Sequence, residues 1–325
     1  MIKDVIHVYF GDYKGHPIIL NYIDNFEIRT SVLDSPKATG SRSKRISSLL
    51  SKMRSLERSQ IRVLHTHDIL SFYLSRFLFP LKRVIFDSHE VYSSYFKFPL
   101  NLIVCILEEI ATLLSSVKIF PSAERRELYF IKRNTVIIEN LFLPNRNPSR
   151  SRDKRDLNSF VYAGLLSRQR CIAELIDMFR NLPQCTLTIY GIKNDYMAKI
   201  IEKGLPANVK YAGSVAHTDL IKLLPKYAAS FALYFPSDLN NKFPAPTKIF
   251  ENEYFGLATI VLSSRYLRRL DREKTIINTL FIDKINSSSL NEIINSGRLG
   301  KCQPNKSPRI LWESQKAVIN GLYSE

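Results

Sequence analysis

The residues with the clearest chemical potential lie in one stretch, 246–261. Its opening Pro-Thr pair is typical of a helix start, Gly256 stands where that helix would end, and a short apolar run of strand type follows. Lys248 would lie in the first turn, where free N–H groups and the helix dipole favour an anion. Glu251, one turn later, could accept hydrogen bonds from sugar hydroxyls. With Thr247, these residues predict a binding site for a nucleotide sugar.

A second group of candidates follows strand-like runs in the second half of the chain. Arg168 and Arg170 come after the run 160–162, at the start of a predicted helix. A guanidinium placed there can pair with phosphate through two hydrogen bonds, although a solvated turn is the alternative. Gly191 and Val215 lie in two further strand–glycine turns, which either let the backbone approach a ligand or are ordinary tight turns.

The first half offers histidines at the ends of predicted strands. His89 follows the run 83–86 and could donate a hydrogen bond to a sugar hydroxyl or to a developing anion; a structural histidine is the alternative. His65 and His67 form an H-x-H pair, which can bind a metal. No further ligand is identifiable from the spacing, so we expect no metal and expect packing beside a cleft instead.

Two further residues of the first half are candidates for the acceptor side. Gly11 and Lys14 follow the first predicted strand, in a loop that could face a phosphate or an acceptor. This signal consists of one glycine and one cation, so it adds a position to the site without defining its chemistry.

Composition limits the compartment and the fold. The chain has 325 residues, enough for two α/β domains. Its four cysteines form no C-x-x-C pair, so neither a zinc site nor a disulfide framework is indicated and a reducing compartment fits best. The N-terminus reads as a strand rather than a signal peptide, and the longest apolar stretch, 98–107, is too short to span a bilayer. A cytoplasmic protein is therefore expected.

The net charge of +17 points to an anionic partner. The densest cationic segment, 37–62, has eight Lys and Arg residues against the single Glu57. It could be a solvated helix face, but clustered cations also attract anionic lipid or nucleic acid. Leu49 and Met53 lie among these cations, and an amphipathic basic helix favours a membrane surface. No nucleic-acid-binding module is visible. The predicted membrane patch comprises Arg42, Lys44, Arg45, Lys52, Arg54 and Arg58.

Strand-like and helical stretches alternate along the chain, which predicts βαβ units and doubly wound parallel sheets. We expect one Rossmann-like domain over 1–147, a polar linker over 148–158 and a second domain over 159–306, with a cleft between the domains. The final helical stretch, 307–325, is expected to pack back on the first domain. Neither G-x-G-x-x-G nor a P-loop motif occurs, which argues against the common dinucleotide and P-loop proteins.

In this order, the motifs resemble those of the GT-B-fold glycosyltransferases, of the family 4 type that assembles bacterial surface polysaccharides such as capsule and lipopolysaccharide. The likeness covers nearly the whole chain. The stretch 246–256 is similar to the family's P-x-K-x-x-E-y-x-x-x-G, residues 87–90 to its D-x-H-E, and residues 164–170 to its G-x-L-x-x-x-[KR]. Glu139 and Asn140 resemble its strand-then-N-G turn, with a leucine in place of the glycine.

The resemblance implies a donor nucleotide bound by the second domain and an acceptor bound by the first. Arg170 and Lys248 would then hold the pyrophosphate, Glu251 would bind the ribose hydroxyls and the region of Val215 would touch the base. His89 would lie over the transferred sugar. The family retains anomeric configuration and generally needs neither a metal nor another cofactor, because cations and helix N-termini neutralise the leaving diphosphate.

Three positions depart from the family pattern and leave the donor open. Phe243 stands where a second glutamate is frequent, Leu165 where an arginine is frequent, and Cys171 where the family has a glycine.

We therefore expect a hexosyltransferase of the cytoplasm, peripheral to the inner face of the membrane, that transfers sugar from a UDP or GDP donor to a lipid-linked or polysaccharide acceptor. Two alternatives remain. The first is a nucleotide-sugar 2-epimerase of the same fold, which would need several acid–base residues, whereas the second half has only His217. The second is a non-catalytic partner subunit, which the substitutions at Phe243 and Leu165 favour.

Overall fold

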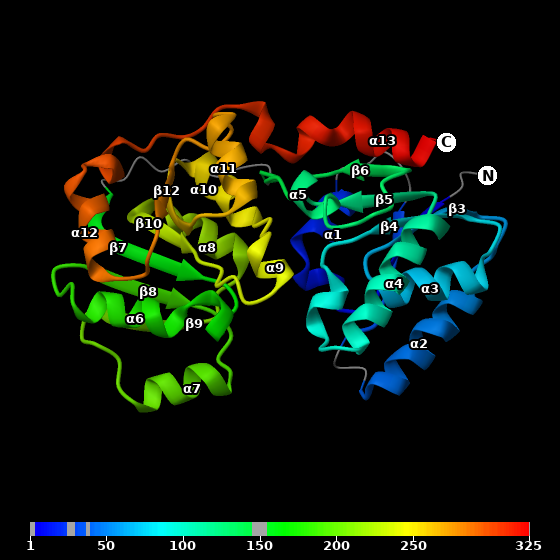
Figure 1. The fold of residues 1–325 in the computed structure, drawn as a ribbon, viewed down its shortest axis with the longest axis horizontal. Coiled ribbons are helices and arrows are strands. Elements are labelled where there is room, and N and C mark those ends of the chain that lie inside the picture. Colours follow the sequence, from blue (N-terminus) through cyan, green and yellow to red (C-terminus); the bar gives the residue numbers. More distant parts are fainter. Residues whose placement is uncertain (1–3, 25–29, 37–39, 145–154, 325) are drawn as a thin grey trace. The chain divides into compact units, whose positions relative to one another are not determined.

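A computed structural model describes residues 4–24, 30–36, 40–144 and 155–324. The chain divides into two compact units, the first formed by Met1–Asn140 with Gln315–Glu325 and the second by Leu141–Ser314. Each unit contains a six-stranded parallel sheet with helices between successive strands (Figure 1). This confirms the predicted α/β class with two doubly wound sheets. Residues 148–154 of the predicted linker and 37–39 of the cationic segment lie outside the described residues.

The sheet of the first unit has the order β2-β1-β3-β4-β5-β6. Successive strands run outward from β1 in both directions, so the order reverses at the neighbouring carboxyl ends of β1 and β3, where doubly wound sheets bind ligands. The strands are β1 (Asp4–Tyr9), β2 (Thr30–Asp34), β3 (Ile61–Thr66), β4 (Arg83–Asp87), β5 (Val117–Phe120) and β6 (Thr135–Ile137).

Right-handed crossovers decide which helices cover each face of this sheet. The chain passes from β2 to β3, β4 and β5 in one direction, which places α2, α3 and α4 side by side on one face (Figure 1). The step from β1 to β2 runs the other way, so α1 lies on the opposite face. The helices are α1 (Pro17–Asp24), α2 (Arg42–Arg54), α3 (Ile69–Leu78), α4 (Leu100–Leu114), α5 (Ala123–Arg126) and α13 (Lys316–Ser324), with short 3₁₀ turns η1 (Tyr13–Gly15) and η3 (Tyr92–Tyr95).

The second unit repeats the design with the order β12-β11-β10-β7-β8-β9, so its direction reverses between β7 and β10. Its strands are β7 (Asp156–Ala163), β8 (Thr186–Tyr190), β9 (Val209–Gly213), β10 (Tyr227–Ala232), β11 (Ala258–Leu262) and β12 (Thr279–Ile282). Its helices are α6 (Ile172–Arg180), α7 (Asp195–Glu202), α8 (His217–Leu223), α9 (Leu239–Lys242), α10 (Thr247–Phe255), α11 (Arg265–Arg272) and α12 (Ser287–Asn295). The 3₁₀ turns are η4 (Arg168–Arg170), η5 (Leu224–Lys226), η6 (Arg298–Lys301), η7 (Pro308–Ile310) and η8 (Trp312–Gln315).

The segment boundaries differ in detail from those expected. Strand β7 begins at Asp156, so the last three residues of the predicted linker belong to the sheet. Residues 307–314 belong to the second unit, and the chain enters the first unit only at Gln315. There α13 is held by side chains of β3: Arg62 Nη2 donates to Ser324 O at 2.7 Å, and His65 Nδ1 lies 2.6 Å from Tyr323 Oη.

Candidate donor site and histidine cluster

Helix α10 positions the predicted donor residues, and its two ends are those expected. Pro246 at its N-terminus provides no side-chain cap, so the first N–H groups of the helix have no side-chain acceptor among the described residues. At the other end Gly256 adopts φ 66°, a left-handed conformation that favours glycine. A Cβ on Gly256 would also lie 2.5 Å from the backbone of Gln303, so the close approach of that segment requires glycine as well.

Lys248 bridges the point where the sheet direction reverses. It stands in the first turn of α10, after β10, and its Nζ donates to Ala163 O at the end of β7 at 2.7 Å. Burial, together with the nearby charge of Arg170, lowers the pKa of Lys248 to about 8, although Glu251 acts in the opposite direction. One of its three N–H donors is used by Ala163, so the others are available to an anion.

Arg170 supplies a second cation to the same place. Its guanidinium lies 4.2 Å over the ring of Tyr234, and its Nη1 donates to Asn241 Oδ1. These contacts orient the group while leaving other N–H donors. Cys171, the next residue, has φ 55°, which explains why a glycine suits this position in proteins with a similar motif. Arg168 is exposed and joins neither contact.

Glu251 combines one paired oxygen with one unpaired oxygen. The residue is 6% exposed, and its Oε2 lies 3.1 Å from Nε2 of His217, the first residue of α8. That hydrogen bond raises the pKa of His217, against the opposing effect of burial. The second carboxylate oxygen, Oε1, is buried without a hydrogen-bond partner among the described residues. A buried acceptor in this state needs a donor, and a ligand hydroxyl would supply one.

Glu253, two residues further on, has a different function although it belongs to the same motif. It is fully buried, and its carboxylate accepts hydrogen bonds from the backbone N–H groups of Ile277 and Asn278. The side chains of Asn278, Thr279 and Asn305 donate to it as well. Glu253 therefore ties α10 to the loop before β12 and to the segment that follows η6.

The other predicted donor residues lie near this group without bonding to it. Gly191 packs against the backbone of the turn that follows β7, since a Cβ there would lie 2.5 Å from Gly164 O. Val215 lies in the loop between β9 and α8, and Thr247 is half-buried at the start of α10. A cavity of about 670 Å³ opens at the ends of β10, β11 and β12, and its lining residues include Cys171, Tyr234, Asn241, Phe243, Ser264 and Asp283. The cavity adjoins Arg170 through Asn241.

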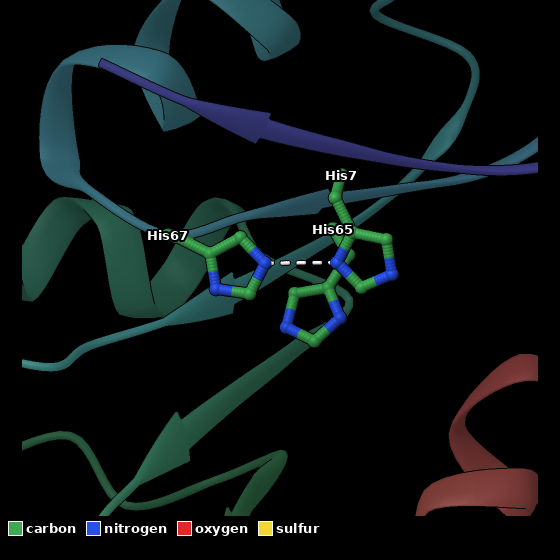
Figure 2. Close-up of side chains that lie close together, drawn as sticks. All are labelled: His7, His65 and His67. Atoms are coloured by element: carbon green, nitrogen blue, oxygen red, sulfur yellow. Dashed lines mark hydrogen bonds between the residues drawn. The ribbon is translucent and has the colours of Figure 1, made fainter. Parts of the chain in front are cut away.

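The first unit gathers histidines at the end of its sheet. His7 of β1 and His65 of β3 are register partners, and side chains alternate along a strand, so His67 lies on the same face as His65. Figure 2 shows the three rings close together, with His7 Nδ1 2.9 Å from His67 Nε2. The rings of His65 and His67 stack with their centroids 4.4 Å apart. All three side chains are buried.

Asp87 and His89 extend this group from β4. Asp87 Oδ2 lies 3.6 Å from His65 Nε2, His67 Nδ1 and His89 Nε2, beyond hydrogen-bond distance, and has no hydrogen-bond partner among the described residues. Burial by itself raises the pKa of the Asp87 carboxyl, but His89, His65 and Tyr22 outweigh it and lower the pKa. Burial also lowers the pKa values of His7, His67 and His89 well below the usual value.

The sequence alone predicted only part of this cluster. His65, His67 and His89 were candidates, whereas His7, Asp87 and the covering Tyr22 and Tyr323 were not. The available signal was the alternation of 65/67 and 87/89 on adjacent parallel strands, which places these side chains on one face. Of the predicted acceptor-side residues, Lys14 is exposed in η1, and Gly11 is confined by the ring of Tyr9, 2.3 Å from where a Cβ would lie.

The predicted membrane patch lies on α2 and, with Arg58, on the segment that follows it, and one expectation about it needs correction. Leu49 and Met53 are fully buried, so the expectation that they provide the apolar face of a membrane-binding helix is wrong: the core of the first unit takes that face. Arg45 is also committed, because its Nη2 donates to Ser35 O at 2.7 Å and its guanidinium lies over Phe10. The remaining cations are exposed: Arg42, Lys44, Lys52, Arg54 and Arg58.

Helix α4 carries the exposed apolar surface instead. One side of the helix buries Glu108, Ala111 and Thr112. On the other sides of the helix, each large apolar side chain has more than a third of its surface exposed: Leu100, Leu102, Ile103, Ile106, Leu107, Ile110, Leu113 and Leu114. The preceding segment adds the exposed rings of Tyr95, Phe96 and Phe98. Among the described residues no helix has the length and apolar character needed to cross a bilayer.

Comparison with known proteins identifies the fold. No protein-family model matches the chain, and no curated protein sequence matches it significantly. Among solved structures, HepE of Anabaena in complex with UDP and glucose aligns with a TM-score of 0.70 at 14% identity, over 100% of both chains. Sucrose-phosphate synthase of Thermosynechococcus elongatus aligns with a TM-score of 0.71 at 14% identity, over 99% of this chain and 98% of that one. The chain has the GT-B fold.

The same fold is found with a different chemistry. The UDP-GlcNAc 2-epimerase of Methanocaldococcus jannaschii aligns with a TM-score of 0.60 at 11% identity, over 99% of this chain and 100% of that one. The GT-B architecture expected from the motifs is therefore confirmed. Since one fold serves several reactions, the activity has to be argued from the residues of the site.

Proposed function

We propose that this protein is a glycosyltransferase whose second unit binds the nucleotide-sugar donor. The observation that carries the proposal is the convergence of Lys248, Arg170 and the unpartnered Oε1 of Glu251 at the carboxyl ends of parallel strands. Two cations suit a diphosphate, and a buried carboxylate oxygen suits a ribose hydroxyl. The structurally similar protein HepE has been solved in complex with UDP, which supports a uridine nucleotide as the first ligand to test. A guanosine nucleotide is the alternative.

The proposed chemistry follows from where charge develops. When the bond between the sugar and the diphosphate breaks, negative charge grows on the departing phosphate oxygen. The Lys248 ammonium, the Arg170 guanidinium and the free N–H groups of α10 would stabilise that charge in place. We propose on this basis a hexosyl transfer whose leaving group needs no metal, and retention of anomeric configuration by analogy with the motifs.

The acceptor side of the proposal rests on the motifs of the first unit. We propose a lipid-linked or polysaccharide acceptor, with Gly11 and Lys14 on the acceptor side, and a role in the assembly of bacterial surface polysaccharide. In the described residues, His89 Nε2 is directed at His67 Nδ1, 3.0 Å away, which bears on its predicted catalytic role and is taken up below.

The first test is donor binding, which is measured as the change in the melting temperature of the purified protein when UDP, GDP, CMP or ADP is added. A nucleotide that binds the native state raises the melting temperature. We expect a shift with UDP or GDP that is lost in Lys248→Met and reduced in Glu251→Gln, while Lys199→Met on exposed α7 keeps it. No shift with any nucleotide would contradict the donor site and favour a non-catalytic partner subunit.

The 2-epimerase remains a second candidate because Glu251 pairs with His217, giving the second unit one acid–base pair. The two reactions differ in their products. A 2-epimerase incubated with UDP-GlcNAc and no acceptor would form either UDP-N-acetylmannosamine or UDP together with free N-acetylmannosamine. A glycosyltransferase would form neither N-acetylmannosamine product. Transfer to an added acceptor with no 2-epimer formed would support the transferase.

We also propose that the first unit docks on an anionic membrane surface at the inner face of the cell membrane. The apolar side chains of α4 are available for insertion between lipids, and the cations of α2 lie two helices away in the same layer (Figure 1). Exposed apolar area combined with basic charge is the pattern of an interfacial protein. The net charge of +17 gives the same preference for anionic lipid.

Vesicle binding separates the two contributions. We expect Ile103→Ser with Ile106→Ser to weaken binding to phosphatidylglycerol vesicles at every salt concentration. Arg42→Gln with Lys44→Gln should weaken binding mainly at low salt, because exposed charges are screened. Phosphatidylcholine vesicles are the control. If the serine variant binds vesicles as the wild type does but changes the oligomeric state, the apolar face covers a second copy of the chain and the membrane proposal is wrong.

A further inference from the structure

Five of the six histidines of this chain lie in one cluster of the first unit. They come from three separate parts of the sequence: His7 and His16 near β1, His65 and His67 at β3, and His89 after β4. Apolar side chains would pack at the end of a sheet at lower cost, because burying a polar imidazole is unfavourable unless it has a partner. So many buried imidazoles in one place therefore indicate a role other than packing.

Within the cluster, two sets of three residues have ligand atoms within 4.8 Å of one another, and one set includes a carboxylate. That set is His67, Asp87 and His89. Their ligand atoms are separated by 3.6 Å from His67 Nδ1 to Asp87 Oδ2, 3.6 Å from His89 Nε2 to Asp87 Oδ2, and 3.0 Å between the two nitrogens. Ligands about 2.0–2.1 Å from a tetrahedral zinc ion lie about 3.4 Å apart, so the observed spacing needs only small adjustment.

We infer that the first unit binds a zinc ion through His67 Nδ1, Asp87 Oδ2 and His89 Nε2. Two imidazoles and a carboxylate are a ligand set that zinc accepts. His65 Nε2 also lies 3.6 Å from Asp87 Oδ2 but does not belong to this mutually close set, so a water molecule would take the fourth position of a tetrahedral ion. The three protein ligands lie at the carboxyl ends of β3 and β4, beside the point where the sheet direction reverses.

The groups around these ligands resemble the supporting shell of a metal site. The far nitrogen of a ligating imidazole usually makes a hydrogen bond that fixes the ring. His67 Nε2, the far nitrogen of one proposed ligand, meets His7 Nδ1 at 2.9 Å. Arg125 Nη1 donates to the backbone oxygen of His89 and so holds the turn that carries this ligand.

The charge of the cluster also calls for a cation. Asp87 is 3% exposed, and its Oδ2 atom faces three imidazole nitrogens at a distance too long for hydrogen bonds. A buried carboxylate oxygen without a partner is costly. A divalent ion between these atoms would supply a partner for Asp87 Oδ2 and for the ligating nitrogens of His67 and His89 together.

The other set, His7, His65 and His67, is less suited to zinc. Figure 2 shows His67 Nε2 directed at His7 Nδ1, and an ion bound here would replace that hydrogen bond, just as an ion in the first set would replace the one between His67 Nδ1 and His89 Nε2. What separates the two sets is that this one lacks a carboxylate to offset the charge of the ion. His7 therefore belongs to the supporting shell.

Zinc ligation would change the assignment of His89. Its Nε2 would be a metal ligand and could not contact a sugar, so His89 would act on the reaction only by holding the turn after β4. Variants of His89 would then lose metal as well as activity. This inference is independent of the donor site, because both its ligands and its test belong to the first unit.

The test is zinc binding by the full chain without a histidine tag. Protein stripped with a chelator would be dialysed against zinc chloride, and bound metal counted by mass spectrometry. We expect one zinc ion per chain, and a tetrahedral spectrum in the visible range when cobalt(II) replaces zinc. Asp87→Asn and His67→Gln should weaken binding at least about ten-fold. His217→Gln removes a histidine outside the cluster and should bind zinc as the wild type does.

The wild-type measurement keeps the inference falsifiable even if a cluster variant fails to fold, which circular dichroism would reveal. Binding of less than one zinc ion per chain by folded wild-type protein after dialysis against zinc chloride would overturn the inference. An octahedral cobalt spectrum, or equal affinity in wild type and folded Asp87→Asn, would overturn it as well.

Discussion

Affinity for the donor nucleotide should fall as the pH rises through the titration of Lys248. Burial and Arg170 lower the pKa of this ammonium to about 8, so it loses its proton within the range where the protein can be studied. A bound diphosphate favours the charged form, so binding above that pH takes up a proton. Affinity should therefore be constant below about pH 7 and decrease above about pH 8.

The size of the effect follows from the fraction of Lys248 that is protonated. With a pKa of about 8, that fraction is about nine-tenths at pH 7 and about one-tenth at pH 9. If only the ammonium form binds UDP, Kd rises about ten-fold between these pH values, or about 1.4 kcal/mol. Lys248→Arg stays charged throughout and should flatten the profile, whatever its affinity at pH 7.

Isothermal titration calorimetry measures both the affinity and the proton. Titrations near pH 8 in two buffers of different ionisation enthalpy should reveal uptake of about half a proton per UDP. Because the nucleotide titrates identically with both proteins, Lys248→Arg controls for its own ionisation. A flat wild-type profile, or the same decrease in wild type and Lys248→Arg, would refute the assignment of Lys248 to the diphosphate.

Three further predictions concern the second unit. Glu253→Gln should lower the free energy of unfolding by about 3 kcal/mol, which corresponds to roughly 10 °C in melting temperature. The reason is that a buried group that only accepts hydrogen bonds is replaced by an amide that also donates. An unchanged melting temperature would show that this network contributes little. His217 has a pKa raised by Glu251, so the bond stabilises the fold below the usual histidine pKa of about 6.5 and its effect is lost as the pH rises through the folded pKa. Glu251→Gln should accordingly lower the melting temperature more at about pH 6 than at about pH 9, and an equal loss at both would contradict this pairing. Burial raises the pKa of the Cys171 thiol to about 11, so iodoacetamide at neutral pH should modify Cys171 only after unfolding, as peptide mass spectrometry would show; rapid native labelling would be inconsistent with the buried position.

The local features of the donor site were predictable because short-range rules govern them. A Pro-Thr start and a glycine end predict α10, and the structure has Thr247–Phe255 with Gly256 in the left-handed conformation. Lys248 follows from this directly, since a residue in the first turn must lie at the N-terminus of the helix. The pairing of Glu251 with His217 was not predictable, because it depends on how the loop after β9 approaches α10.

The same division explains the surfaces of the first unit. Apart from Arg58, the cations that the sequence analysis placed on one helix lie on α2, but the apolar residues Leu49 and Met53 among them face the core. The length of the apolar stretch that begins at Phe98 indicates only that the stretch is too short to span a membrane. Whether an apolar side chain of a helix packs on a sheet or remains exposed depends on which face the crossover connections present, and α4 presents most of its apolar side chains outward.

The sequence by itself determined the alternation of strands and helices, because this depends on local periodicity and on turn residues near each other in the chain. The GT-B architecture was implied by the resemblance of the ordered motifs to those of a known family. Only the tertiary structure decided which residues share a site. Glu251 and Glu253 lie two residues apart on one helix, yet one keeps an unpartnered buried oxygen among the described residues and the other accepts hydrogen bonds from distant loops. The histidine cluster likewise forms only when parallel pairing brings β1, β3 and β4 into register, since its members are far apart along the chain.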